Sequence, residues 1–171
     1  LADYVVTEAG SGADLGAEKF LDIKCRIGKL KPSAIVIVAT IRSLKYNGGA
    51  ELKNLSEPNL EAIRKGSVNL QKHIETVQSF GLPYVVAINK FPTDTDKEVE
   101  ALTKWCKENN HPIELSDVWA KGGDGGIELA NRVLEVLNQE NKFHHLYELD
   151  DSIEQKVEKV DFFLVKGIVE E

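Results

Sequence analysis

The chain has 171 residues, a formal net charge of −7 and 42% hydrophobic residues, a composition typical of one globular domain. The acidic balance argues against unspecific binding to nucleic acid or to anionic membrane surfaces. No apolar run approaches the roughly 20 residues of a membrane-spanning helix, and we expect no signal peptide. The two cysteines, Cys25 and Cys106, are far apart, so we expect reduced structural thiols in a cytoplasmic protein. Because the chain begins at Leu1 and contains no methionine, we expect it to be a piece of a longer protein.

Apolar, β-rich runs recur along the first 140 residues, and each is followed by a stretch with helical spacing. The predicted strands are 4–7, 34–40, 84–88 and 113–118. The predicted helices are 13–26, 58–80 with Pro58 in the first turn, 97–109 and 127–138, followed by a helical stretch from Ser152. Strands that alternate with helices imply right-handed crossovers and a parallel sheet. We therefore predict an α/β fold, a Rossmann-like or P-loop-NTPase-like lobe with helices on both faces of the sheet, over residues 1–140. Residues 141–171 are predicted to be a connecting segment and a C-terminal helix.

The run of residues 38–49 carries the first functional signal. It leaves a strand that we expect to be covered on both faces, and it becomes polar and cationic without a turn signal. Ligands of open α/β sheets bind at the carboxyl ends of the parallel strands. The threonine, arginine, lysine and paired glycines of this run therefore indicate a ligand-binding edge, with Gly48 and Gly49 as a candidate anion site.

Two other loops match nucleotide-binding patterns incompletely. Residues 10–16 resemble a dinucleotide loop, but the third glycine is one place late, so a tight strand-to-helix turn is the favoured interpretation. Residues 89–94 resemble the guanine-reading loop of GTPases, yet Pro92 stands where that loop has aspartate. The chain contains no Gly-x-x-x-x-Gly-Lys-Ser/Thr phosphate loop, which argues against a self-contained GTPase.

Two aromatic residues follow neighbouring predicted strands, and we expect them to form a clamp for a flat ring. Phe91 lies in the polar loop after residues 84–88, and Trp119 precedes a glycine-rich loop, residues 121–126. Stacking on two such faces contributes on the order of 1 kcal/mol beyond burial. The alternatives are a hydrophobic plug for Phe91 and core packing for Trp119.

Other polar clusters indicate ordinary solvated surface. The four histidines have no metal-ligand spacing, and His111 is expected in a turn. Four acidic residues are interpreted as charge at a helix N-terminus: Asp94, Asp96, Glu98 and Glu100. No Ser-His-Asp or Cys-His arrangement is present, so we assign no catalytic residue and no metal ligand to this chain.

Four segments, in order, resemble the formate–tetrahydrofolate ligases (formyltetrahydrofolate synthetases); they are residues 7–20, 38–49, 86–95 and 119–126. The resemblance implies an ATP-dependent ligase that joins formate to tetrahydrofolate through formyl phosphate and gives 10-formyltetrahydrofolate. It also implies ATP with Mg²⁺ and tetrahydrofolate as substrates, no prosthetic group, and a cytoplasmic homotetramer of longer chains. The family's phosphate loop and its arginine for formyl phosphate would lie upstream of Leu1, so we expect these 171 residues alone to be inactive.

The resemblance also implies which residues meet the substrates. The implied folate-binding residues are Phe91, Pro92, Leu115 and Trp119. Those implied to lie near the nucleotide are Lys121, Gly122, Gly123, Gly125 and Gly126.

The chain departs from the family at three places. Ser11 stands where the family usually has phenylalanine facing the folate site, Ser43 replaces a usual alanine, and the likeness stops at Asp161. The competing interpretation is a non-catalytic α/β module that binds folate or nucleotide.

Overall fold

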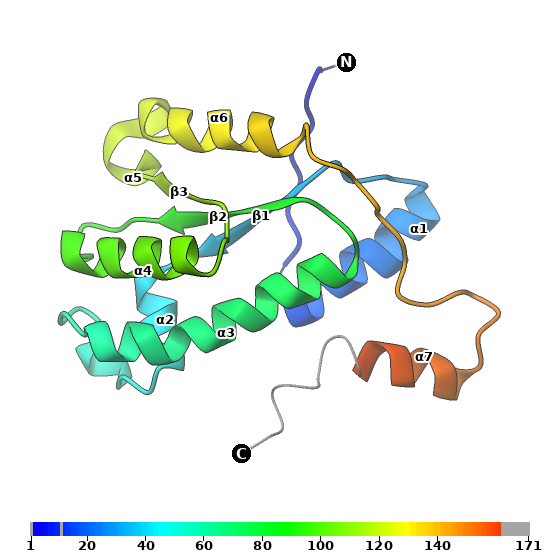
Figure 1. The fold of residues 1–171 in the computed structure, drawn as a ribbon, viewed down its shortest axis with the longest axis horizontal. Coiled ribbons are helices and arrows are strands. Elements are labelled where there is room, and N and C mark those ends of the chain that lie inside the picture. Colours follow the sequence, from blue (N-terminus) through cyan, green and yellow to red (C-terminus); the bar gives the residue numbers. More distant parts are fainter. Residues whose placement is uncertain (1, 11, 162–171) are drawn as a thin grey trace.

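The computed structural model describes residues 2–10 and 12–161. Within these residues, three parallel strands form one sheet in the order β1-β2-β3 (Figure 1). The strands are β1 (Ile35–Ala39), β2 (Tyr84–Asn89) and β3 (Ile113–Ser116). In the register, Val36 lies opposite Val85, and Ile88 lies opposite Leu115. The predicted parallel α/β fold is confirmed.

Helices connect the strands and continue beyond the last strand. The α-helices are α1 (Cys25–Gly28), α2 (Ile41–Asn47), α3 (Leu60–Ser79), α4 (Asp96–Glu108), α5 (Val118–Lys121), α6 (Ile127–Val136) and α7 (Ile153–Val160). The chain ahead of α1 is wound as π-helical turns, and tighter 3₁₀ turns occur in two loops. The π-helical turns are Ala13–Ala17 and Lys19–Lys24, and the 3₁₀ turns are Leu52–Asn54 and Gly122–Gly126.

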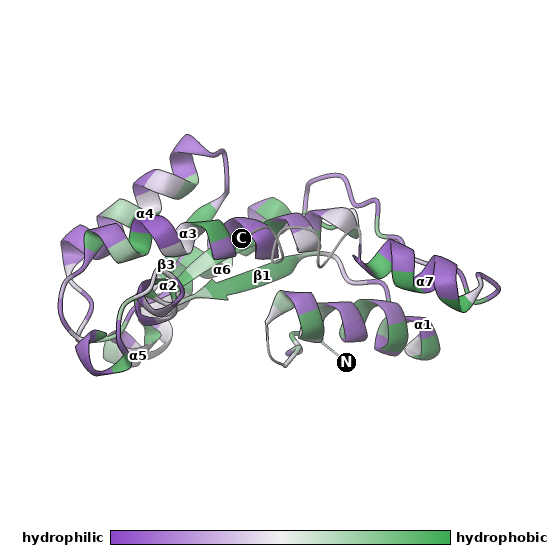
Figure 2. Cartoon of the chain, turned by 90° about the horizontal axis from the view of Figure 1, so that it is seen from below, coloured by the Kyte–Doolittle hydropathy of each residue, from purple (hydrophilic) through white to green (hydrophobic). Residues whose placement is uncertain are grey.

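The sheet lies between two helical layers. Helices α3 and α4 cover one face, where Ile37, Val86 and Ile88 pack with Ile74 and Leu102 in the main core cluster. Helix α6 covers the other face over β2 and β3 (Figure 1). Apolar residues concentrate in the strands and on the inner sides of these helices (Figure 2). Helices therefore flank both faces of the sheet, as predicted.

The outer face of β1 is open to solvent, and the prediction that this strand is covered on both faces is wrong. Val36 and Val38 are 39% and 63% exposed, whereas Val85 and Ala87, their neighbours on the same face of β2, are buried. Side chains alternate along a strand, so a helix must cover each face separately. Helix α6 covers β2 and β3 but does not reach over β1.

Two further predictions of local structure are wrong. Residues 4–7 are exposed and form no strand, because no strand in the described part of the chain pairs with their backbone. Helix α3 begins at Leu60 rather than around Pro58, because the side chain of Asn59 caps it by accepting a hydrogen bond from the Ala62 amide.

Residues 140–151 return along the amino ends of the strands and are held by specific bonds. The amide of Lys142 donates to the carbonyl oxygen of Gly81, and the amide of Leu146 donates to the buried carboxylate of Asp22. Helix α7 then starts after Ser152, whose side chain and that of Gln155 form a capping box. The helical stretch predicted from Ser152 is present, whereas the predictions that concern Ser11 and the tail beyond Asp161 fall outside the described residues.

Candidate functional site

The carboxyl ends of the three strands meet at one edge of the sheet. Asn89, the last residue of β2, lies opposite Ser116, the last residue of β3. The amide of Lys90 also donates to the Ser116 carbonyl oxygen at 3.0 Å, which extends the pairing of β2 and β3 by one bond. The loops that follow these two strands are therefore held side by side, as the sequence predicted.

The first loop presents Phe91 at this edge. The Phe91 amide donates to Oδ2 of Asp94 at 2.8 Å, and the Asp94 amide donates back to the Phe91 carbonyl oxygen at 2.9 Å. The Asp94 side chain is buried, while Phe91 is 37% exposed and Pro92 is exposed. A short rigid turn thus displays the Phe91 ring at the surface, and the ring is not a buried plug.

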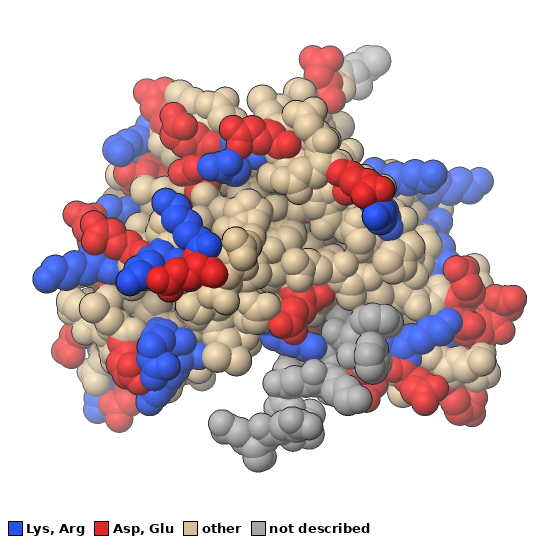
Figure 3. Space-filling view, viewed as in Figure 1, with Lys and Arg blue, Asp and Glu red and all other residues tan. Residues whose placement is uncertain are grey.

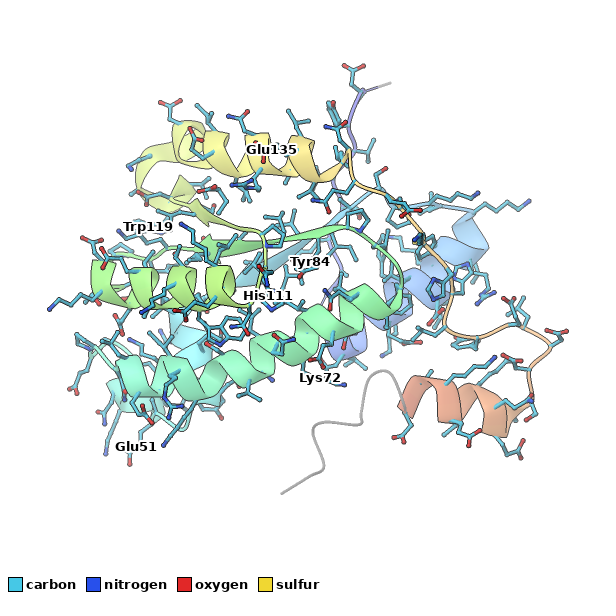
Figure 4. All side chains as sticks on the ribbon, in the orientation of Figure 1. Glu51, Lys72, Tyr84, His111, Trp119 and Glu135 are labelled. Atoms are coloured by element: carbon cyan, nitrogen blue, oxygen red, sulfur yellow. The ribbon has the colours of Figure 1, made fainter. Side chains whose placement is uncertain are left out.

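The second loop presents Trp119 from α5, only three residues after the end of β3 (Figure 4). Trp119 is 66% exposed, so core packing does not explain this residue here. Leu115 is partly buried and packs against the main core cluster from β3. Of the four implied folate-binding residues, Phe91, Pro92 and Trp119 are therefore accessible in adjacent loops, whereas Leu115 packs against the core from β3.

The glycines of the implied nucleotide loop divide into two groups. At Gly122, which has φ +59°, and at Gly123 an added Cβ would meet nothing within 4 Å, so the backbone is open to close approach. At Gly125 the same atom would lie 2.3 Å from the Asp117 carbonyl oxygen, and the Gly125 carbonyl oxygen accepts from the Asp117 amide at 2.9 Å. Gly125 closes the loop, whereas Gly122 and Gly123 leave its backbone accessible to a ligand.

Charges alternate around this edge. Lys90 Nζ lies 2.9 Å from Oδ1 of Asp96, and Lys121 Nζ lies 3.0 Å from Oδ2 of Asp117. The bond to Asp96 and the nearby carboxylates of Asp117 and Asp94 raise the pKa of Lys90, so it stays protonated across the physiological range. On the face seen in Figure 3, basic and acidic side chains are likewise interspersed.

The polar run at residues 38–49 folds differently from the prediction. Thr40 caps α2 by accepting from the Ser43 amide at 3.0 Å, and Arg42 and Ser43 are exposed near the carboxyl end of β1. Lys45, by contrast, is turned inward and is 1% exposed. The side chain of Lys45 therefore lies in the interior of the protein and is not accessible to a ligand at the edge of the sheet.

Gly48, near the end of this run, is required for helix packing, together with Gly66 of α3. A Cβ on Gly48 would lie 1.8 Å from the Ala62 carbonyl oxygen, and a Cβ on Gly66 would lie 1.9 Å from the Leu44 carbonyl oxygen. Helices α2 and α3 therefore approach backbone to backbone at this crossing. This packing accounts for Gly48 without an anion.

Sequence reasoning missed the partner of Lys45, which is Glu98. Lys45 Nζ lies 2.9 Å from Oε1 of Glu98, and both side chains are buried. Burial alone would raise the pKa of Glu98, but hydrogen bonds from Thr95, Lys45 and the Asn59 amide outweigh it and hold the pKa below its usual range. The pattern Thr95-x-x-Glu98 is a capping-box signature that the sequence contained, whereas the lysine lies 53 positions away and left no local signal.

His111, which was expected in a turn, directly follows the turn at residues 109–110 and is buried. It sits at the opposite, amino edge of the sheet, where its Nδ1 is 2.8 Å from the hydroxyl of Tyr84 and its Nε2 is 2.8 Å from Oε1 of Gln71 (Figure 4). A shallow hollow lined by Tyr84, His111 and Lys107 lies here, away from Phe91 and Trp119.

The two cysteines have the properties of structural thiols. Cys25 and Cys106 are free and buried, and burial raises the pKa of Cys106 to about 12, which keeps this thiol protonated. Among the residues that the structure describes, no group of three or more His, Cys, Asp or Glu side chains is placed to hold a metal ion. In that same part of the chain, no helix is both long and apolar enough to cross a membrane.

The fold is an α/β fold with a parallel sheet, the class in which ligands generally bind at the carboxyl ends of the strands. Comparison with known proteins identifies the family. The family model for formate–tetrahydrofolate ligase matches residues 1–164, and the chain belongs to this family.

Two curated relatives are formate–tetrahydrofolate ligases of Bacillus licheniformis and Bacillus pumilus. The chain is 57% and 56% identical to them over 161 residues, which is 94% of this chain. The match covers 29% of each relative, so the chain spans less than a third of their length.

Proposed function

We propose that this chain forms the folate-binding edge of a ligase that joins formate to tetrahydrofolate with ATP and gives 10-formyltetrahydrofolate. One observation carries the proposal for these residues: Phe91 and Trp119 are exposed in adjacent loops at the carboxyl edge of the sheet. Membership of the formate–tetrahydrofolate ligase family supports the reaction.

The proposed role of the two aromatic side chains is to hold the pterin ring of tetrahydrofolate between them. A pterin is flat and aromatic, and rings presented from two loops select that shape before polar contacts form. Pro92 and Leu115 would limit its sideways movement. The work of these residues is to position the folate amine against the activated formyl group, because catalysis of acyl transfer between two bound substrates depends strongly on orientation.

The proposed nucleotide contacts are backbone contacts at Gly122 and Gly123, where space beside the chain is open. Lys121 is exposed and would exchange its bond to Asp117 for a phosphate oxygen. Gly125 and Gly126 would keep the loop closed against Asp117 and Val118. We propose that ATP enters with Mg²⁺, an ion held largely by phosphates and water in such sites.

The remaining features of the proposal concern the longer protein. We propose that the reaction passes through formyl phosphate, that no prosthetic group takes part, and that the ligase is a cytoplasmic homo-oligomer, as expected for the family. Contacts to formate and to the γ-phosphate are assigned to parts of the ligase outside these 171 residues.

The test is the substitution Trp119→Ala in a full-length ligase that carries this segment. Loss of stacking and burial should weaken tetrahydrofolate binding by about 1–3 kcal/mol and raise its KM roughly 5- to 150-fold. The KM for ATP should change little, and kcat should fall less than kcat/KM, because the lost binding is largely uniform.

Two variants serve as controls for this experiment. Trp119→Phe keeps an aromatic face and should recover most of the affinity, while Lys53→Ala removes an exposed side chain remote from this edge and should leave the folate KM unchanged. An unchanged folate KM in Trp119→Ala together with a lower melting temperature would refute the folate role. Absence of ADP release that depends on both formate and tetrahydrofolate in the unsubstituted ligase would refute the reaction.

A further inference from the structure

The carboxylate of Glu98 is the meeting point of three segments that lie far apart in the sequence. Its Oε1 accepts from Lys45 Nζ of α2 at 2.9 Å and from the amide of Asn59 at 3.1 Å. Its Oε2 accepts from the amide of Thr95 at 3.0 Å and from the Thr95 hydroxyl at 2.7 Å. Lys45 Nζ also donates to the Glu57 carbonyl oxygen at 3.1 Å. The buried ion pair is thus saturated with partners from α2, from the chain before α3 and from the loop before α4.

Two of these partners are residues that begin helices. Asn59 is the N-cap of α3, and Thr95 is the N-cap of α4. Because Glu98 binds the backbone amide of each cap residue, it fixes the points at which the chain enters both helices. Lys45 adds the third anchor, since it ties the same carboxylate to α2, the helix that leaves the carboxyl end of β1.

The loop of Phe91 is held between this ion pair and the sheet. At its start, the Lys90 amide bonds to the Ser116 carbonyl oxygen, and at its end, Thr95 bonds to Glu98. Only residues 91–94 lie between these anchors, and the Phe91–Asp94 turn spans them. Release of Thr95 would free one end of the segment that displays Phe91.

We propose that the Lys45–Glu98 ion pair positions Phe91 for folate, acting through Thr95 and the turn that follows β2. Lys45 and Glu98 are positioning residues: they are buried below the edge and do not meet the substrate. The proposal rests on the proposed function for its kinetic consequence, but its structural part stands on the bonds of Glu98 alone.

The variant that separates positioning from stability is Lys45→Met together with Glu98→Leu. Removal of one partner alone would leave a buried charge without its counterion, whereas an apolar pair of similar volume often restores stability. The double variant should therefore fold, yet the amides of Asn59 and Thr95 lose their acceptor. Lys104→Met with Glu108→Leu is the matched control, because this exposed pair on α4 receives the same two substitutions.

The first measurement is amide hydrogen exchange in the full-length ligase that carries this segment. In the Lys45/Glu98 double variant, the amides of Asn59 and Thr95 should exchange about tenfold faster or more, while those of β2 keep their protection. The Lys104/Glu108 control should match the parent chain. Unchanged exchange at Thr95, or equal acceleration throughout the sheet, would overturn the proposal. Glu98→Gln keeps the size of the side chain but only one of its two acceptor oxygens, so if the double variant unfolds, the amide of Asn59 or that of Thr95 should still exchange faster in this variant.

The second measurement is steady-state kinetics in the full-length ligase. The double variant should lose about 10- to 100-fold in kcat/KM for tetrahydrofolate, with the KM for ATP unchanged, because a displaced Phe91 misplaces the folate alone. If the ion pair contributes only to stability, a double variant that is as stable as the unsubstituted ligase should also have the same KM for tetrahydrofolate. That result would overturn the proposal. If the unsubstituted ligase shows no turnover, the proposed function fails, while hydrogen exchange still decides the positioning role.

Discussion

Substitution of Gly66 by alanine tests whether the close crossing of α2 and α3 is required. Gly66 lies in α3, and the added Cβ would sit 1.9 Å from the carbonyl oxygen of Leu44. An ordinary carbon–oxygen contact is about 3.3 Å, so the two helix backbones must separate by about 1.4 Å. Leu44 and Ile63, which are both buried near this crossing, would lose packing with that movement.

The magnitude follows from two opposing effects. The clash is with backbone that no rotamer change can relieve, so the cost should reach the upper end of overpacking, about 3 kcal/mol. The higher helix propensity of alanine, compared with glycine, stabilises the folded chain by roughly 1 kcal/mol, which leaves a net destabilisation of about 2 kcal/mol. For a chain of this size the melting temperature should fall by roughly 4–8 °C.

Urea unfolding followed by circular dichroism measures the effect in the 171-residue chain. The midpoint should fall while the dependence on urea stays the same, because the amount of surface exposed on unfolding does not change. Gly123→Ala is the control, since an added Cβ there meets nothing within 4 Å, and it should stay within about 0.5 kcal/mol of the parent. A Gly66→Ala chain as stable as the parent would show that the crossing tolerates a side chain and that the packing argument is wrong.

Two further predictions concern the open strand face and the buried histidine. Val38→Thr, at an exposed position of β1, should change the free energy of unfolding by less than about 0.5 kcal/mol. Val85→Thr, at a buried position of β2, should lower it by about 1–3 kcal/mol. Equal losses of stability in urea unfolding would contradict the observed difference in exposure. Burial lowers the pKa of His111 despite the opposing charge of Glu75, so below the ordinary histidine pKa of about 6.5 the unfolded chain binds more protons than the folded chain. The contribution of His111 to stability should therefore be present above about pH 6.5 and be lost as the pH falls below it. The substitution His111→Asn keeps an acceptor for the Tyr84 hydroxyl and should reduce the slope of the free energy of unfolding against pH in this range. The same slope in the parent and in the variant would refute the assignment.

The local features of the chain could be predicted from its sequence because they depend on neighbouring residues. The apolar runs at β1, β2 and β3 and the helical spacing between them led directly to a parallel sheet with helices on both faces. Adjacent strands also carried Phe91 and Trp119 to one edge, since both residues follow closely on strand ends. The family likewise was visible in short segments, and the comparison confirms it.

The tertiary structure alone decided which residues of those segments face inward. Lys45 was expected in a cationic run at a ligand-binding edge and Glu98 as charge at a helix N-terminus, and only the folded chain brings them together across 53 positions. Gly48 resembled part of an anion loop until its distance to α3 was known. Residues 4–7 have the composition of a strand, but a strand also needs a partner for its backbone, and pairing is a property of the assembled sheet rather than of the segment.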